Sequence, residues 1–144
     1  MGIALYSEVA RGDVVRGRAI IAKQGYASTI EGIRQCRQDL MDIDASAGFA
    51  RLMRLNDFYS ASDCRDLLFH VQEHRMTLIQ IDAFLRENNL VFLGLQIRAE
   101  VLSAYKLRFP NDPAATNLNQ WQTFENEHPD TFMGMYQFWL QKQK

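Results

Sequence analysis

Apolar and polar residues follow two different periods along this chain, and these periods predict both helices and strands. Apolar residues recur every three or four positions, the spacing that gathers side chains on one helical face, in several segments. These segments are residues 9–24, 46–55 and 99–109, and the runs that open at Ser28, Ser62, Thr77 and Leu118. We therefore expect a helix-rich protein.

Three further segments favour strands. Ile3–Ser7 is a short apolar run, and Leu90–Ile97 is a longer run of apolar and β-favouring residues that follows a helix stop at Asn88 and Asn89. Met135–Gln141 fits either a strand or one helical face, and we favour the strand because the segment is rich in aromatic residues. Helices and strands together place the chain in the α/β class.

Capping residues mark several of the predicted helix ends. Gly25 follows the first helical segment and is a candidate for a left-handed terminator. Ser28 with Glu31 has the spacing of a capping box at the start of the second. Ser62 and Thr77 are the predicted caps of two later helices.

Length and composition predict a single domain over residues 1–144. Hydrophobic residues make up 47% of the chain, charged residues 23%, and the net charge is −1, which gives no general attraction to nucleic acid or an anionic membrane. No apolar run approaches the length of a membrane span. Cys36 and Cys64 are too few for a disulfide framework or a four-thiolate metal site, so we expect a cytoplasmic, reduced protein.

The segment His70-x-x-Glu73-His74 has the H-x-x-E-H pattern of inverted zinc peptidases. On a helix, the two histidines lie about 40° apart, so both could bind a metal while Glu73 activates water. Those enzymes take a third ligand from a more distant glutamate than Glu125 or Glu127. The same residues also fit two other roles: histidines that cap the helix or bond to backbone, and the lining of a polar ligand pocket.

Several runs of the chain together resemble one known family, the C-terminal part of bacterial class I S-adenosylmethionine-dependent methyltransferases of the type attached to tetratricopeptide repeats. The resemblance extends over nearly the whole chain. Its residues are Ile3–Glu8, Glu31–Gln38, Cys64–Arg75, Leu90–Gly94, His128–Phe132 and Met135–Trp139.

The resemblance implies a small mixed three-stranded sheet within a helix-rich single domain. Residues 3–8, 90–97 and 134–141 would correspond to the fifth, sixth and seventh strands of the methyltransferase sheet, with the seventh antiparallel between the other two. The cofactor-binding strands of the family would precede residue 3. Independently, no two glycines of this chain have the G-x-G spacing of a cofactor-binding turn. We therefore expect no autonomous methyl transfer, no cofactor and no resident metal.

In the resembled enzymes, the carboxyl end of the fifth strand and the insertion after it form the acceptor-substrate side. This implies a hollow for a small polar or anionic ligand, with no catalytic residues. Alternatively, Glu8 begins a helix and Arg65 pairs with Asp63 or Asp66 on the surface. The candidate ligand-binding residues are Tyr6, Glu8, Arg65, His70, Glu73 and His74.

A strand over Ile3–Ser7 without its parental neighbour would have a bare apolar edge, and such edges promote pairing between chains. We therefore predict a homo-oligomer, a dimer or larger. The predicted function is a non-catalytic, self-associating binding or interaction module derived from the substrate side of a methyltransferase. Two alternatives stay open: a metal-dependent hydrolase using the histidine motif, and an accessory subunit that complements a separate cofactor-binding chain.

Overall fold

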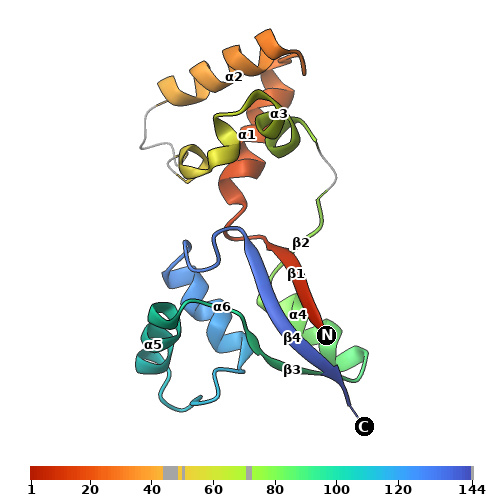
Figure 1. Ribbon diagram of the computed structural model, residues 1–144, viewed down its shortest axis with the longest axis vertical. Helices are drawn as coiled ribbons and strands as arrows, with labels where there is room; N and C mark the ends of the chain where they lie inside the picture. The colour runs from red at the N-terminus through yellow and green to blue at the C-terminus, as the bar shows by residue number, and fades with distance from the viewer. Residues whose placement is uncertain (44–48, 50, 71–72, 144) are drawn as a thin grey trace. The chain divides into compact units, whose positions relative to one another are not determined.

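The chain divides into two compact units, each with its own hydrophobic core (Figure 1). The computed structural model describes residues 1–43, 49, 51–70 and 73–143. Unit 1 combines Met1–Arg11 with His74–Lys144, and unit 2 is Gly12–Glu73. The single domain over residues 1–144 stays a prediction.

Unit 1 contains a mixed sheet in which the last strand is inserted between earlier ones. The strands are β1 (Gly2–Ser7), β2 (Arg75–Met76), β3 (Leu90–Leu95) and β4 (Met135–Lys142), in the order β2-β1-β4-β3. Strand β4 is antiparallel to both β1 and β3, and β2 is parallel to β1. The α/β class and the antiparallel insertion are confirmed. The three-stranded sheet is wrong, because the sheet has four strands; β2 is only two residues long and shows no period of its own.

The strand prediction for the last segment is confirmed. Tyr136, Phe138 and Leu140 are buried, whereas Gln137 and Trp139, which alternate with them, are exposed. This two-residue period places one row of side chains in the core and the other on the opposite face.

Helices of unit 1 cover one face of this sheet; they are α4 (Leu78–Glu87), α5 (Ala99–Arg108) and α6 (Leu118–Glu127). In Figure 1, α4 lies behind β1 and β4. The apolar sides of α4 and α6 pack with the inner row of β4 in one core, where the rings of Tyr105 and Trp121 stack with centroids 3.7 Å apart. Thr77 caps α4 in a capping box with Gln80, as the sequence predicts.

Every regular element in the described residues of unit 2 is helical. Its elements are α1 (Gly12–Gln24), α2 (Ile30–Asp42), the 3₁₀ turns η2 (Leu52–Arg54) and η3 (Asn56–Phe58), α3 (Ala61–Cys64) and the π-helical turn η4 (Arg65–Phe69). Their apolar sides meet in the second core, in which Ile33, Cys36, Leu40 and Phe58 have no exposed surface.

Several local predictions for unit 2 need correction. Gly25 has the expected positive φ of 72°, but α2 is capped by Thr29 instead of Ser28, and α3 by Ser60 instead of Ser62. A cap must reach a free amide in the first turn of its helix. Thr29 accepts the amide of Gly32, and Ser60 accepts the amide of Asp63. The predicted helix over residues 46–55 falls partly outside the described residues, and its described end is the 3₁₀ turn Leu52–Arg54.

None of the helices in the described part of the chain combines the length and the apolar character that a membrane span requires.

Candidate functional site

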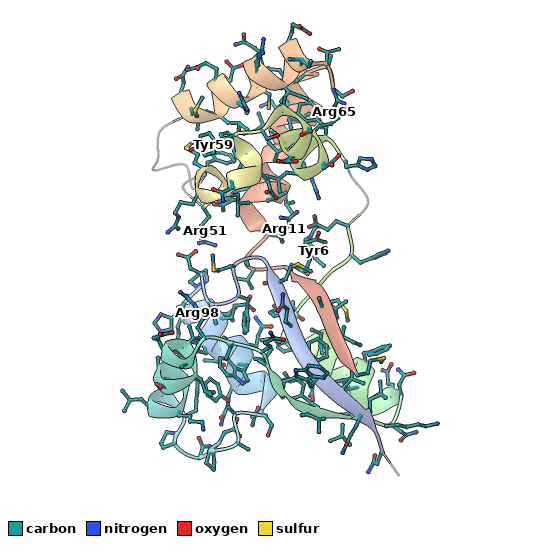
Figure 2. All side chains as sticks on the ribbon, viewed as in Figure 1. Tyr6, Arg11, Arg51, Tyr59, Arg65 and Arg98 are labelled. Atoms are coloured by element: carbon teal, nitrogen blue, oxygen red, sulfur yellow. The ribbon has the colours of Figure 1, made fainter. Side chains whose placement is uncertain are left out.

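Tyr6 lies where the sequence predicts a site, at the carboxyl end of β1. Its half-buried ring is covered by the Arg11 guanidinium, whose carbon lies 4.7 Å from the ring centroid (Figure 2). Glu8 follows with an exposed side chain, and its amide donates to the Met76 carbonyl at 3.1 Å. The backbone of Glu8 thus extends the β1–β2 pairing by one bond.

Beneath this strand end, a buried hydrogen-bond network joins three elements around Glu125, which has no exposed surface. Ser7 donates its hydroxyl proton to one carboxyl oxygen at 2.5 Å, and Tyr136 donates to the other at 2.7 Å. Gln122 donates to Glu125 at 3.4 Å and accepts the Leu78 amide at 2.8 Å. The network therefore ties α6 to β1, β4 and the start of α4.

Burial raises the pKa of Glu125, and the hydrogen bonds from Ser7, Tyr136 and Gln122 partly oppose this rise. Burial also raises the pKa of Tyr136. A perturbed carboxyl group near a strand end can mark a functional site. Here every buried side-chain polar atom among the described residues has a hydrogen-bond partner, so no buried side-chain polar atom of the network is unpaired. Sequence reasoning missed Glu125; its place on the buried face of α6, four residues after Trp121, is the signal that could have found it.

The helix predicted to carry the histidine motif ends before the motif begins. Turn η4 ends at Phe69, and His70 has an extended backbone (ψ 121°) while its amide donates to the Arg65 carbonyl. The prediction that His70 and His74 share one face of a helix is therefore wrong. Among the described residues, no group of three or more His, Cys, Asp or Glu side chains could hold a metal ion.

Glu73 is engaged in a buried ion pair within unit 2. Arg18 donates to a Glu73 carboxyl oxygen at 3.1 Å and to the Leu67 carbonyl from both its Nε and a terminal nitrogen, at 3.1 and 2.8 Å. The Glu73 side chain is only 5% exposed. The Leu67 carbonyl lies in η4, so Arg18 links α1 to that turn and to Glu73.

The six candidate ligand-binding residues are divided between the two units. Tyr6, Glu8 and His74 belong to unit 1, whereas Arg65, His70 and Glu73 belong to unit 2. Arg65 and His70 are exposed, and so is His74. A shared ligand hollow formed by these six residues stays a prediction.

Among the described residues, the face of the sheet opposite the helices of unit 1 carries one charged side chain, Arg75 of β2, on its paired strand positions. Cross-strand partners share a face, and the register pairs Gly2 with Trp139, Ala4 with Gln137 and Tyr6 with Met135. On β3, Val91 pairs with Gln141, and Leu93 is the extra residue of a bulge. Trp139 is 53% and Leu93 48% exposed. We call this surface the outer face; it is formed by Gly2, Ala4, Tyr6, Arg75, Val91, Leu93, Gly94, Met135, Gln137, Trp139 and Gln141.

Trp139 lies directly over the backbone of Gly2. A β-carbon at position 2 would be 3.5–3.7 Å from three atoms of the indole ring. These are ordinary van der Waals distances, so the indole lies against β1 at Gly2 and extends the outer face to the β1 side of the sheet. With 53% of its surface exposed, Trp139 belongs to the outer face and not to the core.

A shallow hollow of 460 Å³ lies on the surface of α4 and α6. It is lined by Ile79, Asp82, Ala83, Arg86, Glu87 and Asn119. Asp82 and Arg86 pair with each other at 2.5 Å across one helical turn. Two of the three charged side chains that line this hollow therefore pair with each other.

Comparison with known proteins leaves the outer face and the strand end as the evidence about function. A scan against models of known protein families finds no match to this chain, and a search of curated proteins finds no matching relative.

Proposed function

We propose that this chain is a non-catalytic interaction module built like the acceptor-side, C-terminal part of a class I methyltransferase, and that it works by self-association. The observation that carries the proposal is the strand order. An antiparallel β4 lies between β1 and β3, and β1 has a parallel neighbour, β2, on its other side. The resemblance implies the place of β4 between β1 and β3, whereas β2 is an addition to it.

The absence of a G-x-G turn in the sequence supports the non-catalytic part of the proposal. A nucleotide-type cofactor needs glycines at such a turn so that the backbone can approach it closely. The glycines with positive φ among the described residues are Gly25, Gly94 and Gly134, which lie in a helix terminus, a bulge and a turn. In each case the positive φ lets the backbone turn or bulge.

The low charge of the outer face supports the interaction part of the proposal. Charged residues form 23% of the chain, yet the outer-face positions of β1, β3 and β4 hold none, and β2 contributes only Arg75. Depletion of charge with exposed aromatic side chains is the composition of protein interfaces. Trp139 is the residue type most often found at the energetic centre of such interfaces.

The hydrolase alternative loses its main support because His70 and His74 do not share a helix and Glu73 is paired with Arg18. The accessory-subunit alternative uses the same surface as our proposal, with a cofactor-binding chain in place of a second copy. Self-association of the purified chain separates our proposal from the accessory-subunit alternative.

Light scattering on a size-exclusion column over a wide dilution series tests self-association. We expect a species of twice the chain's 16.7 kDa that dissociates on dilution. Trp139→Ser should weaken this species, whereas Ile79→Ser, an equally exposed apolar residue on α4, should leave it unchanged. A protein that stays monomeric at every concentration would refute self-association and would favour a separate partner chain.

A further inference from the structure

The backbone hydrogen bonds of β1 alternate in direction. Met1 exchanges bonds with Leu140 at 2.8 and 2.9 Å, and the Ser7 amide donates to Gly134 at 2.9 Å, so both residues face β4. Because peptide groups alternate along an antiparallel pair, Gly2 and Ala4 face the other side. The amide of Glu8, also an even-numbered residue, donates to Met76 on that other side.

The edge of β1 that faces away from β4 is covered by strand β2 only at its carboxyl end. Strand β2 pairs with Tyr6 and Ser7, and within the described residues no strand lies beside Gly2 or Ala4. The predicted bare edge is therefore half covered. Both residues are exposed, and their side chains are a hydrogen atom and a methyl group. Natural edge strands avoid pairing by carrying lysine, proline or an inward charge, and this segment carries none of these.

We propose that two copies of this chain pair through the Gly2–Ala4 edges of their β1 strands, antiparallel about a two-fold axis at Ile3. This inference rests on the proposed function and names its partner and surface. In this register, Gly2 faces Ala4 of the partner subunit, and each pair exchanges both backbone hydrogen bonds. The sheet then continues from one copy into the other.

A second copy fits this edge because the surface is complementary to itself. A two-fold axis brings identical outer faces side by side, which is unfavourable where like charges meet. The outer-face positions of β1 and β4 hold only uncharged residues, and the charged outer-face residue Arg75 lies beside Tyr6, outside the Gly2–Ala4 segment. In addition, the Trp139 indole lies over Gly2, so it reaches Ala4 of the partner subunit and buries apolar surface beside the new backbone bonds.

Amide hydrogen exchange measured by NMR tests the register directly. The Ala4 amide should exchange at least about tenfold more slowly when the protein concentration is raised through the monomer–dimer transition. The amide of Gly134, in the turn before β4, serves as the reference that should not change. If a dimer forms but the exchange of Ala4 does not depend on concentration, the edge register is refuted while self-association stands. If no dimer forms, both fail.

Two variants at one position provide an independent test. Ala4→Pro removes an amide that points away from β4, so it spares the internal ladder and should dissociate the dimer into folded monomers. Ala4→Thr keeps the amide and enlarges the side chain on the outer face, so the dimer should persist. If Ala4→Pro unfolds the chain, Ala4→Lys takes its place, and a dimer that survives a lysine at this edge refutes the inference. A dimer lost in Ala4→Thr but kept in Ala4→Pro would mean packing of outer faces and would also refute it.

Discussion

Glu125 is a buried carboxyl group that two hydroxyl groups and one amide group hold in place. Its partners Ser7, Tyr136 and Gln122 come from β1, β4 and its own helix, α6. Their hydrogen bonds offset part of the cost of removing the carboxyl group from water, and burial still raises its pKa. The folded protein therefore binds this proton more tightly than the unfolded chain does.

This pKa shift predicts a pH dependence of stability. A raised folded-state pKa stabilises the protein below the ordinary value of 4.5, and this contribution is lost as the pH rises through the folded-state pKa. Glu125→Gln, which cannot ionise, should remove that loss, so its stability should not fall as the pH rises above 4.5 and through the folded-state pKa of the wild-type carboxyl group. Urea unfolding followed by tryptophan fluorescence measures it, because Trp121 and Trp139 both lie in unit 1.

The control for this prediction is Glu125→Ala. It leaves the hydroxyl groups of Ser7 and Tyr136 without their acceptor and should lower the free energy of unfolding by about 1–3 kcal/mol at every pH. Parallel pH profiles for the wild type and Glu125→Gln would show that this carboxyl group does not titrate in the range.

At the scale of elements, α2 begins in a crowded position. Its cap, Thr29, accepts the Gly32 amide, and the Gly32 backbone lies so close to the preceding loop that an added β-carbon would be 2.1 Å from the Ala27 carbonyl oxygen. Sequence patterns place a helix here, but they do not show this contact, because it depends on how the loop enters the helix. The same reason explains why Thr29, and not Ser28, provides the cap.

Gly32→Ala should therefore destabilise unit 2, although glycine-to-alanine changes in helices normally stabilise them by up to about 1 kcal/mol. We expect a loss of about 1–3 kcal/mol, the cost of an overpacked site. Gly12→Ala is the matched control, because a β-carbon at the start of α1 would meet nothing within 4 Å. Thermal unfolding followed by circular dichroism distinguishes them; equal midpoints for both variants would contradict the contact.

At the scale of the whole molecule, two cores divide the chain. The core of unit 1 is built from the sheet and helices α4–α6, and that of unit 2 from α1–α3 with the short turns between them. The segment Gly12–Glu73 is inserted between β1 and the rest of unit 1. The sequence shows no linker or change of composition at either boundary, which is why it predicts a single domain.

Because each unit has its own core, a cavity made by mutation in one core should destabilise that unit and not the other. Leu40→Ala in unit 2 should shift the helical transition seen by circular dichroism and leave the tryptophan transition of unit 1 in place. Ile81→Ala in α4 should shift the tryptophan transition. Leu40 and Ile81 are almost fully buried, so each change should cost about 2–5 kcal/mol. Shifts of both transitions by either variant would mean that the units unfold cooperatively as one domain.

The sequence by itself determined the elements whose signals are local. Helical spacing located α1, α4, α5 and α6, alternation identified β4, and single residues such as Gly25 and Thr77 fixed helix ends. The family resemblance added the antiparallel place of β4 between β1 and β3. These features were predictable because they depend on side chains within a few positions of one another.

Only the tertiary structure decided the features that join distant residues. Strand β2 exists because Arg75 and Met76 meet β1, and the turn that ends at Phe69 is held by Arg18 from α1, 49 residues away from Leu67. Glu125 is buried because β1 and β4 bring hydroxyl groups to it across 118 and 11 residues. The free edge at Gly2 and Ala4 was visible in outline from the sequence, but its extent depends on where β2 stops, and no local period records that contact.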